Sequence, residues 1–152
     1  MQVEVADLED PEVRELIALH QHDALASSPP GFSFALDLSG LSDPMISVLG
    51  VWDNGTLIAI GAIKRLSPTQ AELKSMRTHP DHLGRGAAKA ILNGLATLAR
   101  SEGIERLSLE TGTSEKYAPA QALYRGYGFT PGEAFADYTN GPHNQCWHLA
   151  LA

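Results

Sequence analysis

Two apolar, β-branched runs joined by Asn54-Gly55 constrain the fold of this chain more than any other feature. Residues 46–52 and 57–63 flank this dipeptide, and Asn-Gly readily adopts the positive φ angles of a tight hairpin. Beyond Ser67-Pro68-Thr69, residues 71–78 can add a third antiparallel strand. These segments predict a three-stranded antiparallel meander.

The spacing of apolar residues predicts the remaining elements. Helices are expected where these residues recur every three or four positions, over 11–26, 84–100 and 119–127. Strands are expected over 2–6, 105–110 and 146–151, and short helical turns within the ambiguous stretch 32–44. The order predicts an α/β (α+β) fold, with a mixed central sheet, an antiparallel N-terminal meander and flanking helices.

Composition bounds the domain count and the kinds of partner. A chain of 152 residues that is 43% hydrophobic can bury one core, so residues 1–152 are expected to form a single domain. No run approaches the ~20 apolar residues of a membrane span, and Met1 to Asp10 do not resemble a signal peptide. Cys146 and six scattered histidines do not form a zinc-ligand set. We therefore expect a cytoplasmic protein with no membrane partner and no metal.

Charge is distributed unevenly along the chain. The net charge is −7, yet residues 56–130 hold ten bases and six acids. Four of those bases, with only one acid, lie between Lys74 and Lys89. An acidic protein with a basic middle is a poor non-specific nucleic-acid binder, but it can hold a compact polyanion such as a cofactor phosphate.

A short loop with two glycines lies within this basic stretch, between a strand and a long helix. Gly84 and Gly86 let backbone N–H groups approach a ligand, and the free N–H groups and dipole of a helix N-terminus favour phosphate. The spacing fits neither a P-loop nor a dinucleotide-binding fingerprint. The loop is therefore either a phosphate site of another kind or a tight turn before a surface helix.

Two segments carry a family resemblance. Leu83-Gly84-Arg85-Gly86-Ala87-Ala88 resembles motif A of the GNAT acetyltransferase superfamily, Arg/Gln-x-x-Gly-x-Gly/Ala, whose backbone cradles the pyrophosphate of acetyl-CoA. Residues 118–129, Ala-Pro-Ala-Gln-Ala-Leu-Tyr-Arg-Gly-Tyr-Gly-Phe, resemble the superfamily's second recurrent element, Ala-x-x-Leu-Tyr-x-x-x-Gly-Phe. The resemblance spans almost the whole chain and implies a GNAT-like fold. The run Ser-Leu-Glu-Thr-Gly over 108–112, with Phe-Ala-Asp-Tyr over 135–138, looks like a branch of small bacterial N-acetyltransferases. Leu83 departs from the usual Arg or Gln, and Arg85 or His82 can compensate.

The resemblance implies three catalytic elements. A carboxylate should help to deprotonate the acceptor amine, and Glu72 matches the glutamate on the strand before motif A. The alternative is a solvated Glu72 that pairs with Lys74 on the same strand face. Tyr124 matches the tyrosine that protonates the coenzyme A thiolate, or else it simply packs in the core. Backbone N–H groups near Met76 and Arg77 would stabilise the oxyanion.

The same resemblance implies two sets of binding residues. The cofactor-binding set is Met76, Arg77, Thr78, Leu83, Gly84, Arg85, Gly86, Ala87, Ala88 and Lys89. The acceptor-binding candidates are His20, His22, Ser28, Phe32, Lys74 and Thr111. Exposed helix histidines, and cap or turn formation at Thr111, are the simpler explanations for several of these.

The function implied is direct, acetyl-CoA-dependent acetyl transfer to the amine of a small-molecule or amino-acid-like acceptor. The alternatives are a non-catalytic acyl-CoA sensor, a protein lysine or N-terminal acetyltransferase, and a nucleotide-binding α/β protein of another kind. A homodimer is common among relatives, and Trp147 in the last strand is a candidate for its interface.

Overall fold

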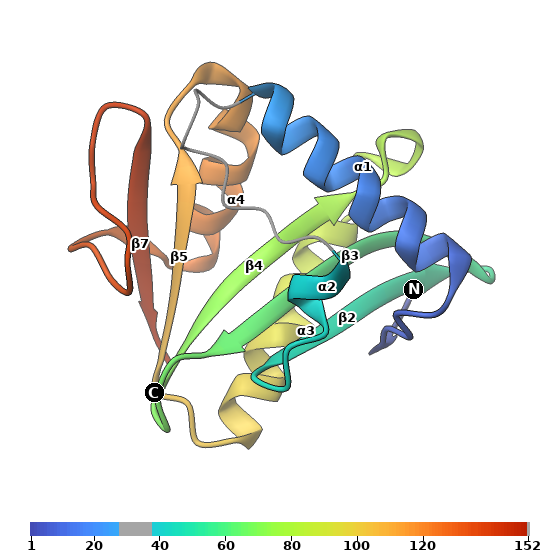
Figure 1. Cartoon of the computed structure of the whole chain (residues 1–152), viewed down its shortest axis with the longest axis horizontal. Coiled ribbons are helices and arrows are strands. Elements are labelled where there is room, and N and C mark those ends of the chain that lie inside the picture. The colour runs from blue at the N-terminus through green and yellow to red at the C-terminus, as the bar shows by residue number, and fades with distance from the viewer. Residues whose placement is uncertain (28–37, 152) are drawn as a thin grey trace.

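The computed structural model describes residues 1–27 and 38–151 as seven strands, four α-helices and two short 3₁₀ turns (Figure 1). The strands are β1 (Gln2–Val5), β2 (Ile46–Asp53), β3 (Thr56–Arg65), β4 (Gln70–Thr78), β5 (Arg106–Gly112), β6 (Thr130–Pro131) and β7 (Asn144–Ala150). The helical elements are α1 (Pro11–Ser27), α2 (Leu38–Leu41), η1 (Pro80–His82), α3 (Ala87–Ser101), η2 (Glu115–Tyr117) and α4 (Ala118–Tyr127). The expected mixed α/β architecture is confirmed.

All seven strands form one mixed sheet in the order β1-β2-β3-β4-β5-β7-β6. The predicted meander is confirmed, because β2, β3 and β4 pair antiparallel in succession. Asn54 and Gly55 form the turn between β2 and β3, with φ angles of 50° and 81°. The hairpin prediction therefore holds for the backbone reason on which it was based.

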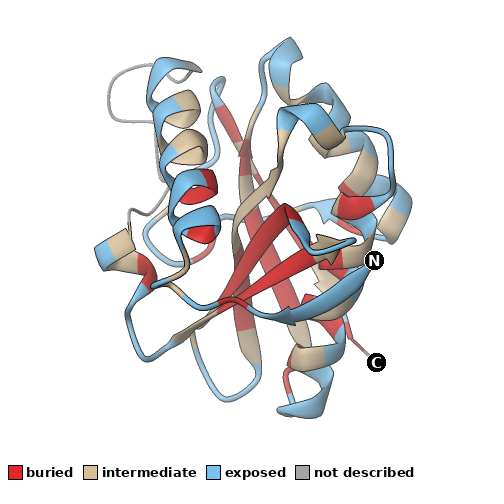
Figure 2. Cartoon of the chain, turned by 90° about the vertical axis from the view of Figure 1, so that its right-hand side faces the viewer, coloured by how far each residue is buried: buried red, intermediate tan, exposed pale blue. Residues whose placement is uncertain are grey.

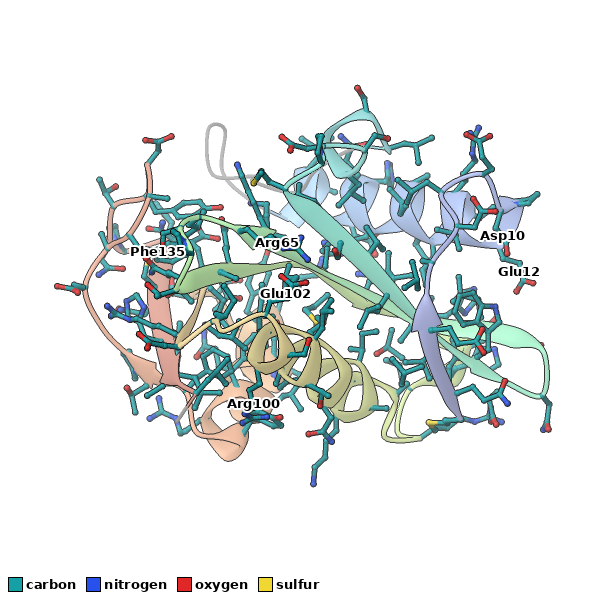
Figure 3. All side chains as sticks on the ribbon, turned by 90° about the horizontal axis from the view of Figure 1, so that it is seen from below. Asp10, Glu12, Arg65, Arg100, Glu102 and Phe135 are labelled. Atoms are coloured by element: carbon teal, nitrogen blue, oxygen red, sulfur yellow. The ribbon has the colours of Figure 1, made fainter. Side chains whose placement is uncertain are left out.

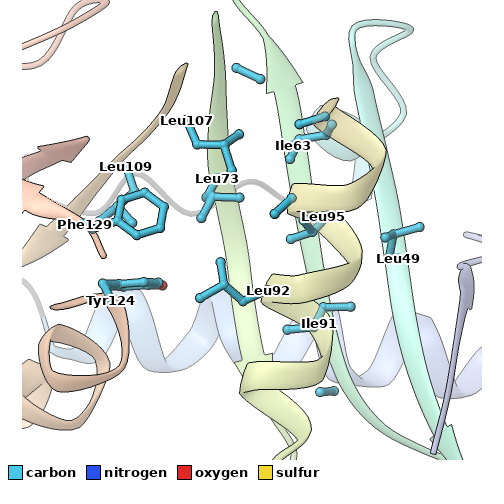
Figure 4. Close-up of a cluster of buried hydrophobic side chains, with 14 of the residues drawn as sticks. Leu49, Ile63, Leu73, Ile91, Leu92, Leu95, Leu107, Leu109, Tyr124 and Phe129 are labelled. Carbon is cyan, nitrogen blue, oxygen red and sulfur yellow. The ribbon is translucent and has the colours of Figure 1, made fainter. Parts of the chain in front are cut away.

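Helices cover both faces of the sheet (Figure 1). On one face, Val13, Leu16 and Ile17 of α1 join a buried cluster with Ile60 and Ala62 of β3. On the opposite face, α3 and α4 pack over a larger cluster whose labelled side chains converge in Figure 4. Figure 2 shows the resulting band of buried residues along the middle of the sheet.

The sheet opens between β4 and β5, which are its only parallel pair in the described chain. They pair over three positions, from Gln70–Arg106 to Glu72–Ser108. Figure 1 shows the two strands diverging from that point toward their C-terminal ends. β4 also has a bulge on its other side, where Ser75 has a φ of 54° and the register between β3 and β4 shifts at Gly61. The opening brings residues from both faces of the sheet to one place.

An ion pair ties the end of β3 to the end of α3. Both guanidinium nitrogens Nε and Nη2 of Arg65 donate to the Glu102 carboxylate at 2.6 Å, and the two side chains meet in Figure 3. The bidentate contact lowers the pKa of Glu102 and raises that of Arg65. It anchors α3 at the end distant from the glycine loop.

Several details differ from the sequence-based expectations. The helix predicted from Gly84 begins at Ala87, because Gly84 and Gly86 adopt positive φ angles of 77° and 82° and stay in the loop. The strand expected over 2–6 is β1, and all four of its residues are exposed. Trp147 is only 2% exposed and lies under the Arg125 guanidinium at 5.0 Å, so it cannot present a dimer interface.

Two further points concern segment 32–44 and membrane spans. The expected helical turns are found in part, as α2, while residues 32–37 lie outside the described chain. Among the described residues, no helix is both long and apolar enough to cross a membrane.

Candidate active site

A cavity of about 170 Å³ lies where β4 and β5 separate. Its walls come from α1, β4, β5, η2, α4 and the segment 132–143. The polar side chains that line it are His20, Glu72, Lys74, Ser75, Glu110, Thr111, Tyr117, Tyr124, Tyr138 and His143. The cavity therefore holds groups that can exchange protons and groups that can bind charge.

One wall is a buried network of three side chains. Tyr138 donates to Glu72 Oε2 at 2.5 Å, and Lys74 Nζ donates to the same oxygen at 3.2 Å. Lys74 also donates to the Tyr138 hydroxyl at 2.8 Å. The side chains of Glu72 and Lys74 are 4% and 10% exposed, so the predicted pair exists but is buried rather than solvated. Burial and the neighbouring Glu72 carboxylate raise the pKa of Tyr138 and keep its phenol protonated.

Glu110 is a second cavity carboxylate, and it is not among the site residues predicted from the sequence. It is half-buried on β5, and Asn144 Nδ2 donates to its Oε2 at 3.1 Å. Burial raises the pKa of Glu110, while the Asn144 hydrogen bond and the nearby Lys74 partly offset that rise. A sequence signal did exist: β5 alternates buried Leu107 and Leu109 with polar positions, which places Glu110 opposite the hydrophobic core.

Tyr124 lies on the other side of the opening, on α4. It is 7% exposed, and its ring packs edge-to-face on Phe129 with centroids 5.7 Å apart (Figure 4). Burial raises the pKa of Tyr124 to about 12, so its phenol is protonated at neutral pH. Tyr124 both packs in the core and lines the cavity, so the two sequence interpretations are compatible.

The glycine loop presents open backbone at the N-terminus of α3. A Cβ atom added at Gly84 or Gly86 would meet no atom within 4 Å, and no side chain caps the helix. The first N–H groups of this 15-residue helix are therefore open to a ligand. Nearby, Arg85 Nη1 lies 3.4 Å from Asp53 Oδ2 and 3.2 Å from His82 Nδ1. Leu83 is 67% exposed. Its side chain is aliphatic, so it supplies neither charge nor a hydrogen bond to the loop.

Comparisons with known proteins show the family of this chain. The family model for the acetyltransferase (GNAT) family matches residues 12–129 of the chain. This chain belongs to the GNAT acetyltransferase family. It is 41% identical over 149 residues to the uncharacterised N-acetyltransferase YedL of Escherichia coli strain K12, covering 98% of this chain and 94% of YedL.

Solved structures share the fold of this chain. A Klebsiella pneumoniae protein described as an acyl-CoA N-acyltransferase superposes with a TM-score of 0.81 and 28% identity, covering 99% of this chain and 97% of its own. The Salmonella typhimurium protein yncA, solved with its cofactor acetyl-CoA, superposes with a TM-score of 0.75 at 17% identity, covering 99% and 94%. The GNAT chain described here is accordingly an acyltransferase.

The loop of this GNAT acetyltransferase fits the cofactor that its family uses. Open space at Gly84 and Gly86, with uncapped N–H groups on α3, suits a pyrophosphate. On β4, Met76 lines the cavity, and Arg77 forms an ion pair with Asp23 of α1. Beyond Glu72, β4 has no strand partner on its β5 side within the described sheet, so some backbone groups near Met76 are open to a ligand.

The acceptor candidates fall into three groups. His20, Lys74 and Thr111 line the cavity. His22 is exposed and does not line the cavity, because residues two apart on a helix point about 200° away from each other. Ser28 and Phe32 lie outside the described residues. Burial and Arg77 lower the pKa of His20 to about 4, so its imidazole is neutral at physiological pH.

Proposed function

We propose that this protein transfers the acetyl group of acetyl-CoA directly to the amine of a small-molecule acceptor. The observation that carries the proposal is the cavity between β4 and β5, where the protonated phenol of Tyr124 and two carboxylates line one space. The proposed reaction needs an acid for the departing sulfur and a base for the attacking amine. The loop at the start of α3 supports the use of a phosphate-bearing cofactor.

Each step is assigned to a group of this chain. Acetyl-CoA, when bound, supplies the activated acetyl thioester. The backbone N–H groups of the glycine loop and the start of α3 would hold its pyrophosphate, with Arg85 and Lys89 adding positive charge. Unpaired backbone N–H groups of β4 near Met76 would stabilise the negative charge that develops on the acetyl oxygen.

Proton transfer involves the two sides of the cavity. Tyr124 would donate its phenolic proton to the sulfur, which a neutral phenol can do at physiological pH. A cavity carboxylate would take the proton of the acceptor ammonium before the nitrogen attacks. Glu72, which was selected from the sequence, and Glu110 both line the cavity.

The size and charge of the cavity support a small acceptor. A volume of about 170 Å³ suits a small amine or an amino-acid-like molecule, since pockets for drug-sized ligands usually exceed about 300 Å³. Lys74 uses two of its three N–H donors on Glu72 and Tyr138, which leaves one for an acceptor carboxylate. An unchanged KM for carboxylate-bearing acceptors in Lys74→Ala would refute that contact.

The test is thiol release from acetyl-CoA with a panel of amines, amino acids and a lysine-rich peptide. Tyr124→Phe removes only the hydroxyl, and we expect kcat to fall about 100-fold while coenzyme A still binds. Tyr127→Phe is the matched control, because Tyr127 lies on the same helix but does not line the cavity. Equal activity in the two variants would remove Tyr124 from the mechanism.

The same assay distinguishes the other functions. Binding of coenzyme A without turnover on any acceptor would favour a non-catalytic sensor. Turnover on the peptide alone would favour a protein lysine or N-terminal acetyltransferase. Absence of coenzyme A binding would refute the proposed use of the glycine loop.

A further inference from the structure

The two carboxylates of the cavity have very different surroundings. Glu72 Oε2 accepts hydrogen bonds from both Lys74 and Tyr138, and the three side chains form a closed network. Protonating Glu72 would break an ion pair whose side chains are 4% and 10% exposed. Separating such a buried pair leaves an ammonium group without its counterion, which strongly destabilises the folded protein.

Glu110 has fewer hydrogen-bond partners than Glu72 among the described residues. Among the described residues, its hydrogen-bond partner is a neutral amide, Asn144 Nδ2, on one of its two oxygens. Glu110 lines the cavity, so it can reach a ligand there. Burial already raises its pKa, and a carboxylate whose pKa is nearer neutrality is a more effective proton acceptor.

We propose that Glu110, oriented by Asn144, takes the proton from the acceptor ammonium, and that Glu72 with Lys74 and Tyr138 forms a neutral wall of the cavity. This proposal rests on the proposed function and assigns the base within the same site. It also gives the ammonium group a place to bind, because Lys74 already neutralises Glu72 and leaves Glu110 as the carboxylate available to a cation.

The protons and bonds balance as follows. The acceptor ammonium transfers one proton to the Glu110 carboxylate, and the freed electron pair forms the bond from nitrogen to the acetyl carbon. As the carbon–sulfur bond breaks, the sulfur keeps the electron pair and receives the Tyr124 proton. The tyrosinate recovers a proton from the new amide nitrogen, and Glu110 releases its proton to solvent. The net reaction yields an acetamide, coenzyme A thiol and one proton.

Asn144 can serve both protonation states of Glu110. Its side chain is buried, and its Oδ1 has no hydrogen-bond partner within the described part of the chain. With Glu110 ionised, Nδ2 donates to the carboxylate. When Glu110 is protonated, a half-turn of the amide presents Oδ1 as an acceptor for the new O–H group. Asn144 is therefore a positioning residue.

Other titratable groups surround Glu110 from every neighbouring element. They are Glu72 and Lys74 of β4, Cys146 of β7, Tyr138 and His143 of the segment 132–143, His20 of α1, Tyr117 of η2 and Tyr124 of α4. Glu72 raises and Lys74 lowers the pKa of Glu110. A pH profile of the wild-type protein alone would not identify the base, and matched variants are needed.

The experiment compares Glu110→Gln with Glu72→Gln, which are isosteric changes on adjacent strands. The full chain is used, with an acceptor that the wild type acetylates. For each variant, kcat/KM is measured as a function of pH, and coenzyme A affinity and melting temperature are measured separately. Wild-type turnover decides the proposed function first, so failure there is distinct from failure of the base assignment. We expect Glu110→Gln to lose about 100-fold in kcat/KM together with the acidic limb of the profile. Glu72→Gln should keep the limb and melt at a lower temperature.

Two further measurements keep the proposal testable if a variant folds poorly. Asn144→Asp places a second carboxylate beside Glu110, and we expect the acidic limb to move up by about one pH unit. NMR titration of side-chain-labelled glutamate, with Glu110 identified by its absence in Glu110→Gln, should give a pKa above the usual ~4.3 without any substrate. If Glu72→Gln does not fold, the Glu72→Gln/Lys74→Met double variant, which removes both charges, replaces it.

The proposal is overturned if the acidic limb survives in Glu110→Gln. Loss of the limb in Glu72→Gln, or in the double variant, also overturns it. An unshifted limb in Asn144→Asp removes the positioning role, because a residue with only a structural role would change stability and leave the profile in place.

Discussion

Substitution of Gly86 by alanine separates the ligand-binding role of the glycine loop from its conformational role. Gly86 has a φ of 82° and open space around the position of an added Cβ. Gly103, in the turn between α3 and β5, has a φ of 81° and the same open space. The two glycines therefore impose the same local demand on the backbone, but only Gly86 lies in the proposed phosphate site.

The magnitudes follow from this match. An L-residue in the left-handed region costs roughly 1 kcal/mol or slightly more, which corresponds to a fall in melting temperature of about 2–4 °C at this chain length. That cost applies equally to Gly86→Ala and Gly103→Ala, since neither Cβ clashes. At Gly86 the Cβ also occupies the space a phosphate would enter. Loss of one hydrogen bond to a charged group is worth about 1.5–3 kcal/mol, or about 10- to 100-fold in the dissociation constant.

The assay is calorimetric titration of both variants with coenzyme A, alongside thermal unfolding without ligand. We expect equal losses of melting temperature and weakened coenzyme A binding in Gly86→Ala alone. Equal affinity for coenzyme A in the two variants would refute the placement of the pyrophosphate at this loop.

Three other substitutions test the rest of the fold and site. The pKa of His20 lies near 4 in the folded protein against 6.5 unfolded, so the unfolded state binds more protons between these values and stability falls as the pH drops through them. In urea titrations, the free energy of unfolding of the wild type should fall by up to about 3 kcal/mol over this pH range, and His20→Asn should not show this fall. Lys74→Met should lower the free energy of unfolding by about 3 kcal/mol, and adding Glu72→Gln should restore part of it; a neutral single variant would contradict the buried pair. Gly61→Ala should cost about 1–3 kcal/mol by calorimetry, because its Cβ would come within 2.7 Å of a neighbouring sulfur atom in the core.

Local signals predicted the fold well because each has a short-range physical cause. The Asn54-Gly55 turn and the apolar stripe of α1 depend on backbone preference and on side-chain periodicity. The predicted start of α3 is three residues too early. The helical spacing of small and apolar residues continues back to Gly84, whereas Gly84 and Gly86 have positive φ angles that a helix does not allow. Periodicity reports which face is apolar and is silent about the exact residue at which a helix begins.

The site was predictable only in part, since it is assembled from long-range contacts. The glycine loop and Tyr124 lie within contiguous motifs and were selected from the sequence. Tyr138 and Asn144 lie outside the predicted helices and strands, yet they contact Glu72 and Glu110 across 66 and 34 positions of the chain. Contacts at such separations depend on how the strands are ordered in the sheet, which a single sequence does not reveal.

The early end of pairing between β4 and β5 gives a central strand some of the properties of an edge strand. β4 is fourth of seven in the sheet order, but it pairs with β5 over only three positions. Its remaining amides on that side lack the protection of a neighbouring strand and should exchange with deuterium readily, although the strand is interior in the sheet order. Exposed strand edges attract other chains, and here α1, α4 and the segment 132–143 surround the opening and screen it. The fold thus keeps an unpaired stretch of backbone beside the cavity, inside a sheet that is otherwise continuous.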